Sequence, residues 1–133
     1  MKVINIYKEG NEGLEIHSDE RGSIVDIFYN TQINHVAIIN SSPSIIRGNH
    51  YHKETTQHIL ITEGELEYWY QPLDSEDLPQ MYLAKKGDLI TTSPYEIHTL
   101  KITEKGNTFI VFSEGKRGGS NYESDTFRVP SII

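Results

Sequence analysis

The sequence predicts an all-β protein, folded as a sandwich, a jelly roll or a small barrel. Short runs rich in Ile, Val, Thr, Tyr and Phe recur between turn residues, whereas the apolar residues show almost no helical periodicity. Many short strands at this spacing suit a closed or two-layered β architecture better than an α/β fold. The 133 residues leave room for one continuous core and not for a second, so we expect a single domain over residues 1–133.

About ten strands are expected in succession, each a short β-branched or aromatic run bounded by Gly, Pro, Asn or Asp. Tight turns are expected at Gly64, Gly87 and Gly106, where glycine permits a positive φ, and Pro43 breaks a strand. The segment 72–80 is expected to be an exposed acidic loop. The expected strands are residues 3–7, 23–29, 34–40, 45–52, 57–62, 65–70, 80–85, 88–92, 97–103 and 107–113.

The barrel is expected over about residues 19–113, after an N-terminal strand region, 1–18, and before a C-terminal tail, 114–133. The tail is glycine-rich and polar at first, then partly apolar. Three roles stay open for it: covering a sheet edge, packing on a partner subunit, or moving freely.

The composition excludes several classes of function. Without cysteine, the chain has neither disulfides nor a thiolate zinc site, so any metal must be held by His, carboxylate or amide groups. A net charge of -7 with no basic block argues against binding nucleic acid or an anionic membrane. The opening "MKVINIYKEG" has the pattern of neither a signal peptide nor a membrane span, so we expect a soluble, cytoplasmic protein.

The stretch "RGNHYHKETTQ" holds the strongest candidates for chemistry. Residues two apart on a strand face the same side, so His50 and His52 project together, and Gln57 follows at the start of the next apolar run. If the strand that begins near His98 lies beside the first, three imidazoles converge in the geometry of a metal site with open positions. Proton transfer on a substrate, and ordinary packing on a strand, are the alternatives.

Two cations flank the histidine pair, and in an acidic chain Arg47 and Lys53 are where a phosphate or carboxylate would bind. A structural ion pair is the alternative for Arg47. The remaining histidines, His17, His35 and His58, have no comparable partners in sequence and are expected in turns, at the surface or at an interface. Packing is expected for the nearby aromatic residues, Tyr51, Tyr68, Trp69 and Tyr70.

These residues resemble the two motifs of the cupin superfamily. In the first motif, two histidines separated by one residue are followed by a glutamate and then by a glycine, and the matching positions are His50, His52, Gln57 and Gly64. The second motif is matched loosely at Gly87, Pro94 and His98. The resemblance implies a cupin jelly roll, a double-stranded β-helix barrel, in agreement with the all-β prediction.

Within cupins, "RGNHYHKETTQ" is similar to the R-G-x-H-x-H-K-x-x-x-Q signature of dTDP-4-keto-6-deoxyglucose 3,4-ketoisomerases, and "DERGSIVDI" is similar to a segment near their start. These enzymes share the RmlC-like fold of the 3,5-epimerases. The resemblance covers about residues 19–113 and implies that His50 and His52 are acid and base. It further implies that Gln57 orients a histidine or binds the sugar, and that Arg47 meets the diphosphate or a developing enolate. The implied substrate is a dTDP- or UDP-linked 4-keto-6-deoxysugar, and the implied assembly is a homodimer.

A metal-binding function is the alternative. The tail "GGSNYESDTFRVP" is similar to that of the zinc-binding cupin domain of capsule-biosynthesis reductases, and "NHVAIIN" lacks a tyrosine that the ketoisomerases carry. The ligands would be His50, His52, Gln57 and His98, and zinc, iron, nickel and manganese all suit them. A neutral amide in place of glutamate weakens a hard divalent site. Such a cupin would bind a small molecule, sense it or serve as an accessory subunit, so both the metal and the function stay open.

Overall fold

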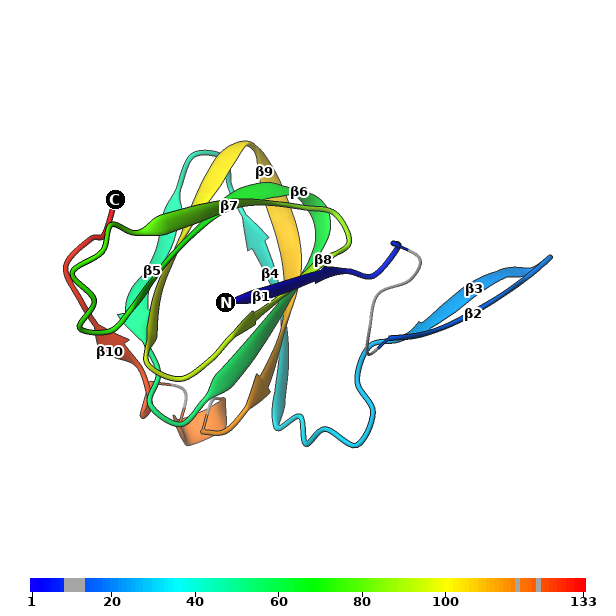
Figure 1. Cartoon of the computed structure of the whole chain (residues 1–133), viewed down its shortest axis with the longest axis horizontal. Helices are drawn as coiled ribbons and strands as arrows, with labels where there is room; N and C mark the ends of the chain where they lie inside the picture. Colours follow the sequence, from blue (N-terminus) through cyan, green and yellow to red (C-terminus); the bar gives the residue numbers. More distant parts are fainter. Residues whose placement is uncertain (9–13, 117, 122) are drawn as a thin grey trace.

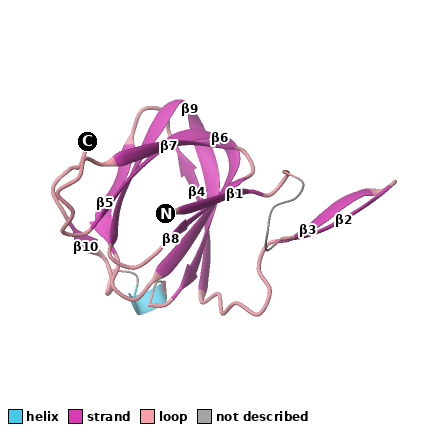
Figure 2. Ribbon diagram, in the orientation of Figure 1, coloured by secondary structure: helices cyan, strands magenta, loops and turns pink. Residues whose placement is uncertain are grey.

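A computed structural model describes residues 1–8, 14–116, 118–121 and 123–133 of the chain, and nearly all regular structure in it is β (Figure 2). The strands are β1 (Lys2–Asn5), β2 (Glu15–Asp19), β3 (Gly22–Asp26), β4 (His35–Ser41), β5 (Ile46–Tyr51), β6 (Thr56–Pro72), β7 (Gln80–Lys85), β8 (Asp88–Thr92), β9 (Glu96–Glu114) and β10 (Phe127–Arg128). A short 3-10 helix, η1, covers Gly119–Asn121.

Eight of the described strands form one sheet, which curves into a barrel (Figure 1). The strand order is β1-β8-β6-β9-β5-β10, with β4 paired to β9 and β7 paired to β6. The pairings are antiparallel, and strands distant in sequence lie side by side, as when β1 pairs with β8. The predicted all-β jelly roll is confirmed.

Two long strands, β6 and β9, replace four of the predicted short strands. They pair along almost their whole length, and the register shifts twice around Gly64. Gly64 and Gly106 have φ values of 71° and 67°, as predicted, but they bend continuous strands instead of ending them. A Cβ on Gly64 would collide with the carbonyl oxygen of Gly106, so the two backbones approach as closely as glycine allows.

The core fills the interior of the barrel. Alternate residues of β6 point inward, which places Ile59 and Ile61 inside, while Leu60 and His58 point to the outer face. Its buried members are Ile59, Ile61, Leu66, Tyr68, Ala84, Ile90, Leu100, Ile102, Phe109 and Val111.

The hairpin β2–β3 projects away from the barrel as a separate two-stranded sheet (Figure 1). β2 was not predicted, and the predicted strand 23–29 ends at Asp26 as β3. The segment that follows returns to the barrel, where Ile27 and Phe28 pack against Leu60 and Leu89 on the outer face. Thus the expected barrel, residues 19–113, includes part of a hairpin that lies outside the sheet and omits β1 and β10, which belong to it.

The C-terminal tail covers a sheet edge, one of the three roles left open for it. β10, which was not predicted, pairs antiparallel with β5 and sets Arg128 opposite His50. Within the described residues, the structure contains no helical segment with the length and hydrophobicity that a membrane crossing requires.

Candidate functional site

Three histidines from adjacent strands converge inside one end of the barrel. His50 on β5 lies directly opposite His98 on β9, and His52 follows the end of β5. One ring nitrogen from each histidine lies within 4.8 Å of the other two. His52 and His98 are each only 2% exposed. The structure therefore brings together the three imidazoles identified from the sequence, from positions almost fifty residues apart.

A bulge in β5 aims these side chains. Gly48 pairs with Thr99 and His50 with His98, so Asn49 is the extra residue in β5, and its φ is 56°. The Asn49 amide oxygen accepts a hydrogen bond of 2.7 Å from the Thr99 hydroxyl, which holds the bulge in place. Gly48 has a φ of 94°, and a Cβ there would lie 2.6 Å from the carbonyl oxygen of His98.

The bulge also changes which neighbours share the inner face. By simple alternation Arg47 and His50 would point to opposite sides, but the extra residue places both on the same side. They line one cavity of about 330 Å³. The cavity is lined by Ile39, Ile46, Arg47, Gly48, His50, Gln57, Ile59, His98, Leu100, Phe109, Glu123, Thr126 and Arg128.

The two members of the predicted acid–base pair differ in their access to this cavity. His50 and His98 line it, whereas His52 is not among the lining residues. The ring centroids of His50 and His52 are 5.0 Å apart, and those of His50 and His98 are 4.6 Å apart. A ligand in the cavity would therefore meet His50 and His98 before His52.

Gln57 connects the histidines to β6. Its side chain is 5% exposed, and its Oε1 lies 3.2 Å from Nε2 of His52. On the other side of the ring, Nδ1 of His52 lies 2.8 Å from the carbonyl oxygen of Asp125, which can only accept a hydrogen bond. Nδ1 is thus the donor. Nε2 of the neutral ring then has only a lone pair, and it faces the amide oxygen of Gln57, which is also an acceptor. Three arrangements would resolve this: a second proton on the ring, an amide turned so that its nitrogen faces the ring, or a cation bound by both lone pairs.

The two predicted cations lie in different places. Arg47 lines the cavity, and its guanidinium donates to the Ser41 hydroxyl at 2.9 Å and to the Asn40 carbonyl at 3.3 Å. Lys53 is not among the lining residues, and its Nζ lies 4.2 Å from the centroid of the Phe127 ring. A cation–π contact of this kind stabilises an exposed ammonium group by about 0.5–1 kcal/mol.

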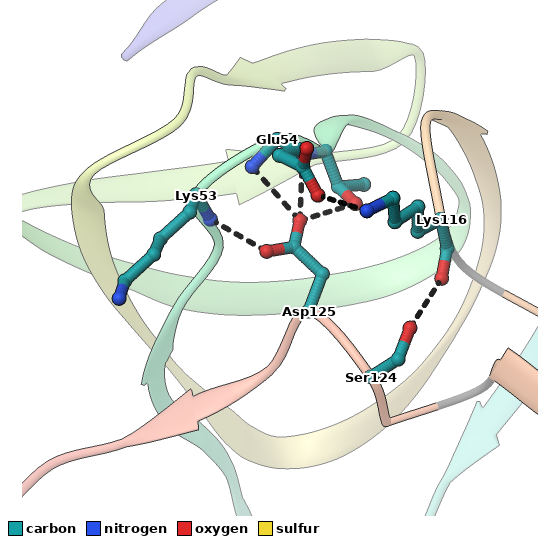
Figure 3. Close-up of polar contacts among 6 residues, drawn as sticks. Lys53, Glu54, Lys116, Ser124 and Asp125 are labelled. Carbon is teal, nitrogen blue, oxygen red and sulfur yellow. Dashed lines mark hydrogen bonds and ion pairs between the residues drawn. The ribbon is translucent and has the colours of Figure 1, made fainter.

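Asp125 in the tail is a site residue that sequence reasoning missed. Its carboxylate is 5% exposed and accepts from the amides of Lys53, Glu54 and Thr55 and from the Thr55 hydroxyl, at 2.8–2.9 Å (Figure 3). Burial raises the pKa of Asp125, but these donors outweigh it, and the pKa lies below its usual 3.8. The only signal in the sequence was the alternation of Phe127 and Val129, which fits a strand.

Tyr68 was predicted to pack and does so, directly against the site. Its ring is fully buried and stacks parallel to His98, with centroids 6.3 Å apart. Its hydroxyl forms a hydrogen bond with the buried hydroxyl of Thr92. Burial raises the pKa of Tyr68 well above its usual value, and nearby Glu96 adds to the rise, so the phenol stays neutral.

The other histidines lie away from the cavity. His17 is exposed on β2, and His35 begins β4. His58 lies within β6 and is 8% exposed, so it is neither in a turn nor at the surface, two of the three positions expected for it; the third, an interface, stays a prediction. It is held between the Thr91 hydroxyl at 2.8 Å and the Glu114 carboxylate at 2.7 Å. A carboxylate and a hydroxyl from two neighbouring strands satisfy both ring nitrogens, which explains how a histidine is buried there.

The donor set at the cavity fits a divalent metal. Three imidazole nitrogens lie within 4.8 Å of one another, and the amide oxygen of Gln57 lies beside one of them. Imidazole suits zinc, iron and nickel, and the Asp125 carbonyl supplies the outer hydrogen bond that ligating histidines usually have. His50, His52, His98 and Gln57 would hold the ion.

The fold is similar to those of several solved structures. A 3,4-ketoisomerase from Helicobacter canadensis matches with a TM-score of 0.72 and 17% identity, over 96% of this chain and 90% of that one. A mutant of the 3,4-ketoisomerase QdtA from Thermoanaerobacterium thermosaccharolyticum, in complex with TDP-4-keto-6-deoxyglucose, matches with a TM-score of 0.68 and 16% identity, over 87% and 83%. The predicted RmlC-like cupin fold is confirmed.

A longer protein is also similar. The capsular polysaccharide assembling protein CapF from Staphylococcus aureus matches with a TM-score of 0.67 and 19% identity, over 89% of this chain, which spans only 34% of CapF. A search of curated protein sequences gives no significant match. The model of one family, described as the polysaccharide biosynthesis C-terminal domain, matches residues 17–122. The chain therefore belongs to the polysaccharide biosynthesis C-terminal domain family.

Proposed function

We propose that the chain acts on a nucleotide-linked 4-keto-6-deoxysugar as a 3,4-ketoisomerase or an epimerase, in the synthesis of a cell-surface polysaccharide. The observation that carries this proposal is the meeting of His50 and His98 with Arg47 around one cavity. Family membership supports the pathway, and the likeness to two ketoisomerases, one holding TDP-4-keto-6-deoxyglucose, supports the substrate class.

The chemistry suits imidazole. Ketoisomerisation and epimerisation both begin by removing a proton from a carbon next to a carbonyl, and imidazole gives and takes protons near neutral pH. His50 lines the cavity and would contact the sugar, while His52, with its ring centroid 5.0 Å from that of His50, is its partner in the predicted acid–base pair. A cavity of about 330 Å³ is at the small end for a ligand site, so it would hold the sugar and leave the nucleotide outside.

Arg47 would receive the negative charge of the substrate. Its anchored guanidinium offers planar donors at the cavity wall, suited to a diphosphate oxygen or a developing enolate. Lys53 has no such place in the proposal, because its ammonium lies over the ring of Phe127. Gln57 would keep His52 in its orientation.

The test is hydrogen exchange at the sugar ring. The purified protein is incubated with dTDP- and UDP-linked 4-keto-6-deoxyglucose in deuterated buffer, and the products are analysed by NMR. Deuterium at a ring carbon or a shifted ketone is expected, with loss of both in His50→Asn. His17→Asn, on the exposed hairpin, is the matched control and should keep the activity. No exchange and no shifted ketone across several nucleotide sugars would refute the proposal.

A second candidate function is metal binding for small-molecule recognition, sensing or an accessory role without isomerase activity. The contact between Nε2 of His52 and Oε1 of Gln57 favours it, since a cation would satisfy both lone pairs. When bound, a divalent metal would polarise a carbonyl or enolate oxygen of a ligand in the cavity. Elemental analysis of untagged protein should then give one metal per chain, and chelation should lower the melting temperature. A metal-free protein with unchanged melting would exclude this function.

A cytoplasmic location and a homodimer complete the proposal. The outer face of β4 supports the dimer, because Val36 and Ile38 are 58% and 70% exposed there. Light scattering during gel filtration should give twice the chain mass of 15.2 kDa, and the mass of a single chain would contradict the dimer.

A further inference from the structure

We propose that Asp125 is the residue that positions His52. The C-terminal tail therefore contributes a positioning residue to the site. The inference rests on the proposed function only in treating His52 as a functional residue, and it holds for either proton transfer or metal binding. Three sets of contacts carry it: one from the main chain of Asp125, one from its side chain and one from its neighbours in the tail.

The main chain of Asp125 acts on the histidine directly. Its carbonyl oxygen lies 2.8 Å from Nδ1 of His52, in a buried contact between residues 73 positions apart. A carbonyl only accepts, so this contact holds the proton on Nδ1 and leaves Nε2 of the neutral ring with its lone pair directed toward Gln57. A base or a metal ligand needs that lone pair, and a free imidazole would divide between two tautomers.

The side chain of the same residue fixes where that carbonyl lies. One carboxylate oxygen accepts from the Lys53 amide, and the other accepts from the amides of Glu54 and Thr55 and from the Thr55 hydroxyl (Figure 3). The residues that donate, 53–55, follow His52 directly in the chain. One aspartate thus binds both the imidazole and the backbone that comes after it. Hydrogen bonds to a charged group are stronger than those between neutral groups, so four of them attach this short segment firmly.

Neighbouring contacts keep the tail in register with β5. The amide of Val129 donates to the Asn49 carbonyl at 2.9 Å, and Phe127 stacks on Tyr51 with ring centroids 5.3 Å apart. On the other side of the chain, the Tyr95 amide donates to the carbonyl of His52 at 2.7 Å. The main chain around His52 is therefore held from two sides, and Asp125 adds the constraint on the ring.

The test reads the tautomer of His52 without measuring activity. Two-bond proton–nitrogen correlation spectra of the uniformly labelled, chelator-treated full chain distinguish a protonated ring nitrogen from an unprotonated one. In the wild type, Nδ1 should be protonated and Nε2 unprotonated. In Asp125→Ala, His52 should change to a mixture of tautomers, and the amide signals of residues 53–55 should shift with it.

Ser124→Ala is the matched control. It is the adjacent residue, it is exposed, and its hydroxyl donates to the Lys116 carbonyl at 3.4 Å (Figure 3). It should leave the tautomer unchanged. If Asp125→Ala does not fold, Thr55→Ala replaces it, because it removes one of the four donors and should produce a partial change in the same direction.

The outcomes separate this inference from the proposed function. Retention of the Nδ1 proton on His52 while the amides of residues 53–55 shift would overturn it, as would an equal change in Ser124→Ala. Loss of a hydrogen-bond partner of a ligating or catalytic histidine lowers metal affinity or rate about 10- to 100-fold, and Asp125→Ala should show that loss in whichever activity the wild type has. A wild type with neither activity would refute the proposed function and leave the tautomer result as it stands.

Discussion

The hydrogen bond between Tyr68 and Thr92 gives the sharpest prediction about how the site is supported. Both residues are buried, at 0% and 1% exposure, and their hydroxyls pair with each other beside the ring of His98. Tyr68→Phe removes the pair and leaves the Thr92 hydroxyl without a partner and without water. Leaving a buried polar group unsatisfied costs about 1–3 kcal/mol, and Thr92→Val should cost a similar amount by leaving the phenol unsatisfied.

The double variant decides whether that reasoning is right. With Phe at 68 and Val at 92, both polar groups are gone and the shapes are kept, so the free energy of unfolding should return close to that of the wild type. The coupling energy would then be about 1–3 kcal/mol, within the range known for residues in contact. Urea unfolding followed by circular dichroism measures it, with an unchanged denaturant slope as the check on two-state behaviour. Additive effects of the two substitutions would refute the explanation.

Three further predictions follow from the bend, the tail and the donor set. Gly64→Ala should lower the free energy of unfolding by about 2–5 kcal/mol, because it adds left-handed strain and overpacking. Gly119 is the control: its φ is 55° and a Cβ there would meet nothing within 4 Å, so Gly119→Ala should cost only the strain, about 1–2 kcal/mol. Equal losses of the two variants in urea unfolding would contradict the close approach at Gly64. Because the pKa of Asp125 is lowered in the folded protein, its carboxylate stabilises the fold above pH 3.8, and this contribution is lost as the pH falls through the folded pKa. The difference in the free energy of unfolding between wild type and Asp125→Asn should therefore shrink in acid. A difference that stays constant with pH would contradict the lowered pKa. Gln57→Glu should tighten zinc binding, measured in a competition titration with a chromophoric chelator, and should reduce any metal-free proton exchange at the sugar. If neither zinc binding nor proton exchange changes, position 57 is not part of the site.

Much of the barrel could be predicted because its strands follow simple alternation. β7 and β8 have the predicted ends. The shared face of His50 and His52 followed from the same rule, whereas their convergence with His98 was predicted only on the condition that two distant strands lie side by side. Alternation is a local property, so it is readable from residues near one another in the chain.

The features that sequence reasoning missed depend on contacts between distant segments. The bulge at Asn49 was not predicted, although a glycine followed by asparagine inside a strand is compatible with one; its position is fixed by the hydroxyl of Thr99, fifty positions away. The continuity of β6 and β9 depends on each long strand supporting the bend in the other, so Gly64 and Gly106, each typical of a turn, become part of one curve. Asp125 resembles any polar tail residue until the loop after His52 surrounds it.

Both candidate functions, proton transfer and metal binding, depend on the contact between Nε2 of His52 and Oε1 of Gln57. With Nδ1 of His52 committed to the Asp125 carbonyl, the chemistry at Nε2 is left to a neutral amide. A carboxylate at 57 would add negative charge to a metal site, whereas the neutral amide adds none. The amide therefore favours proton transfer over metal binding at the site. The lone pairs facing each other 3.2 Å apart favour a shared cation, and only one occupant, a proton or a metal, can satisfy that contact at a time. The function of the site therefore depends on which occupant the Nε2 lone pair binds more tightly at neutral pH.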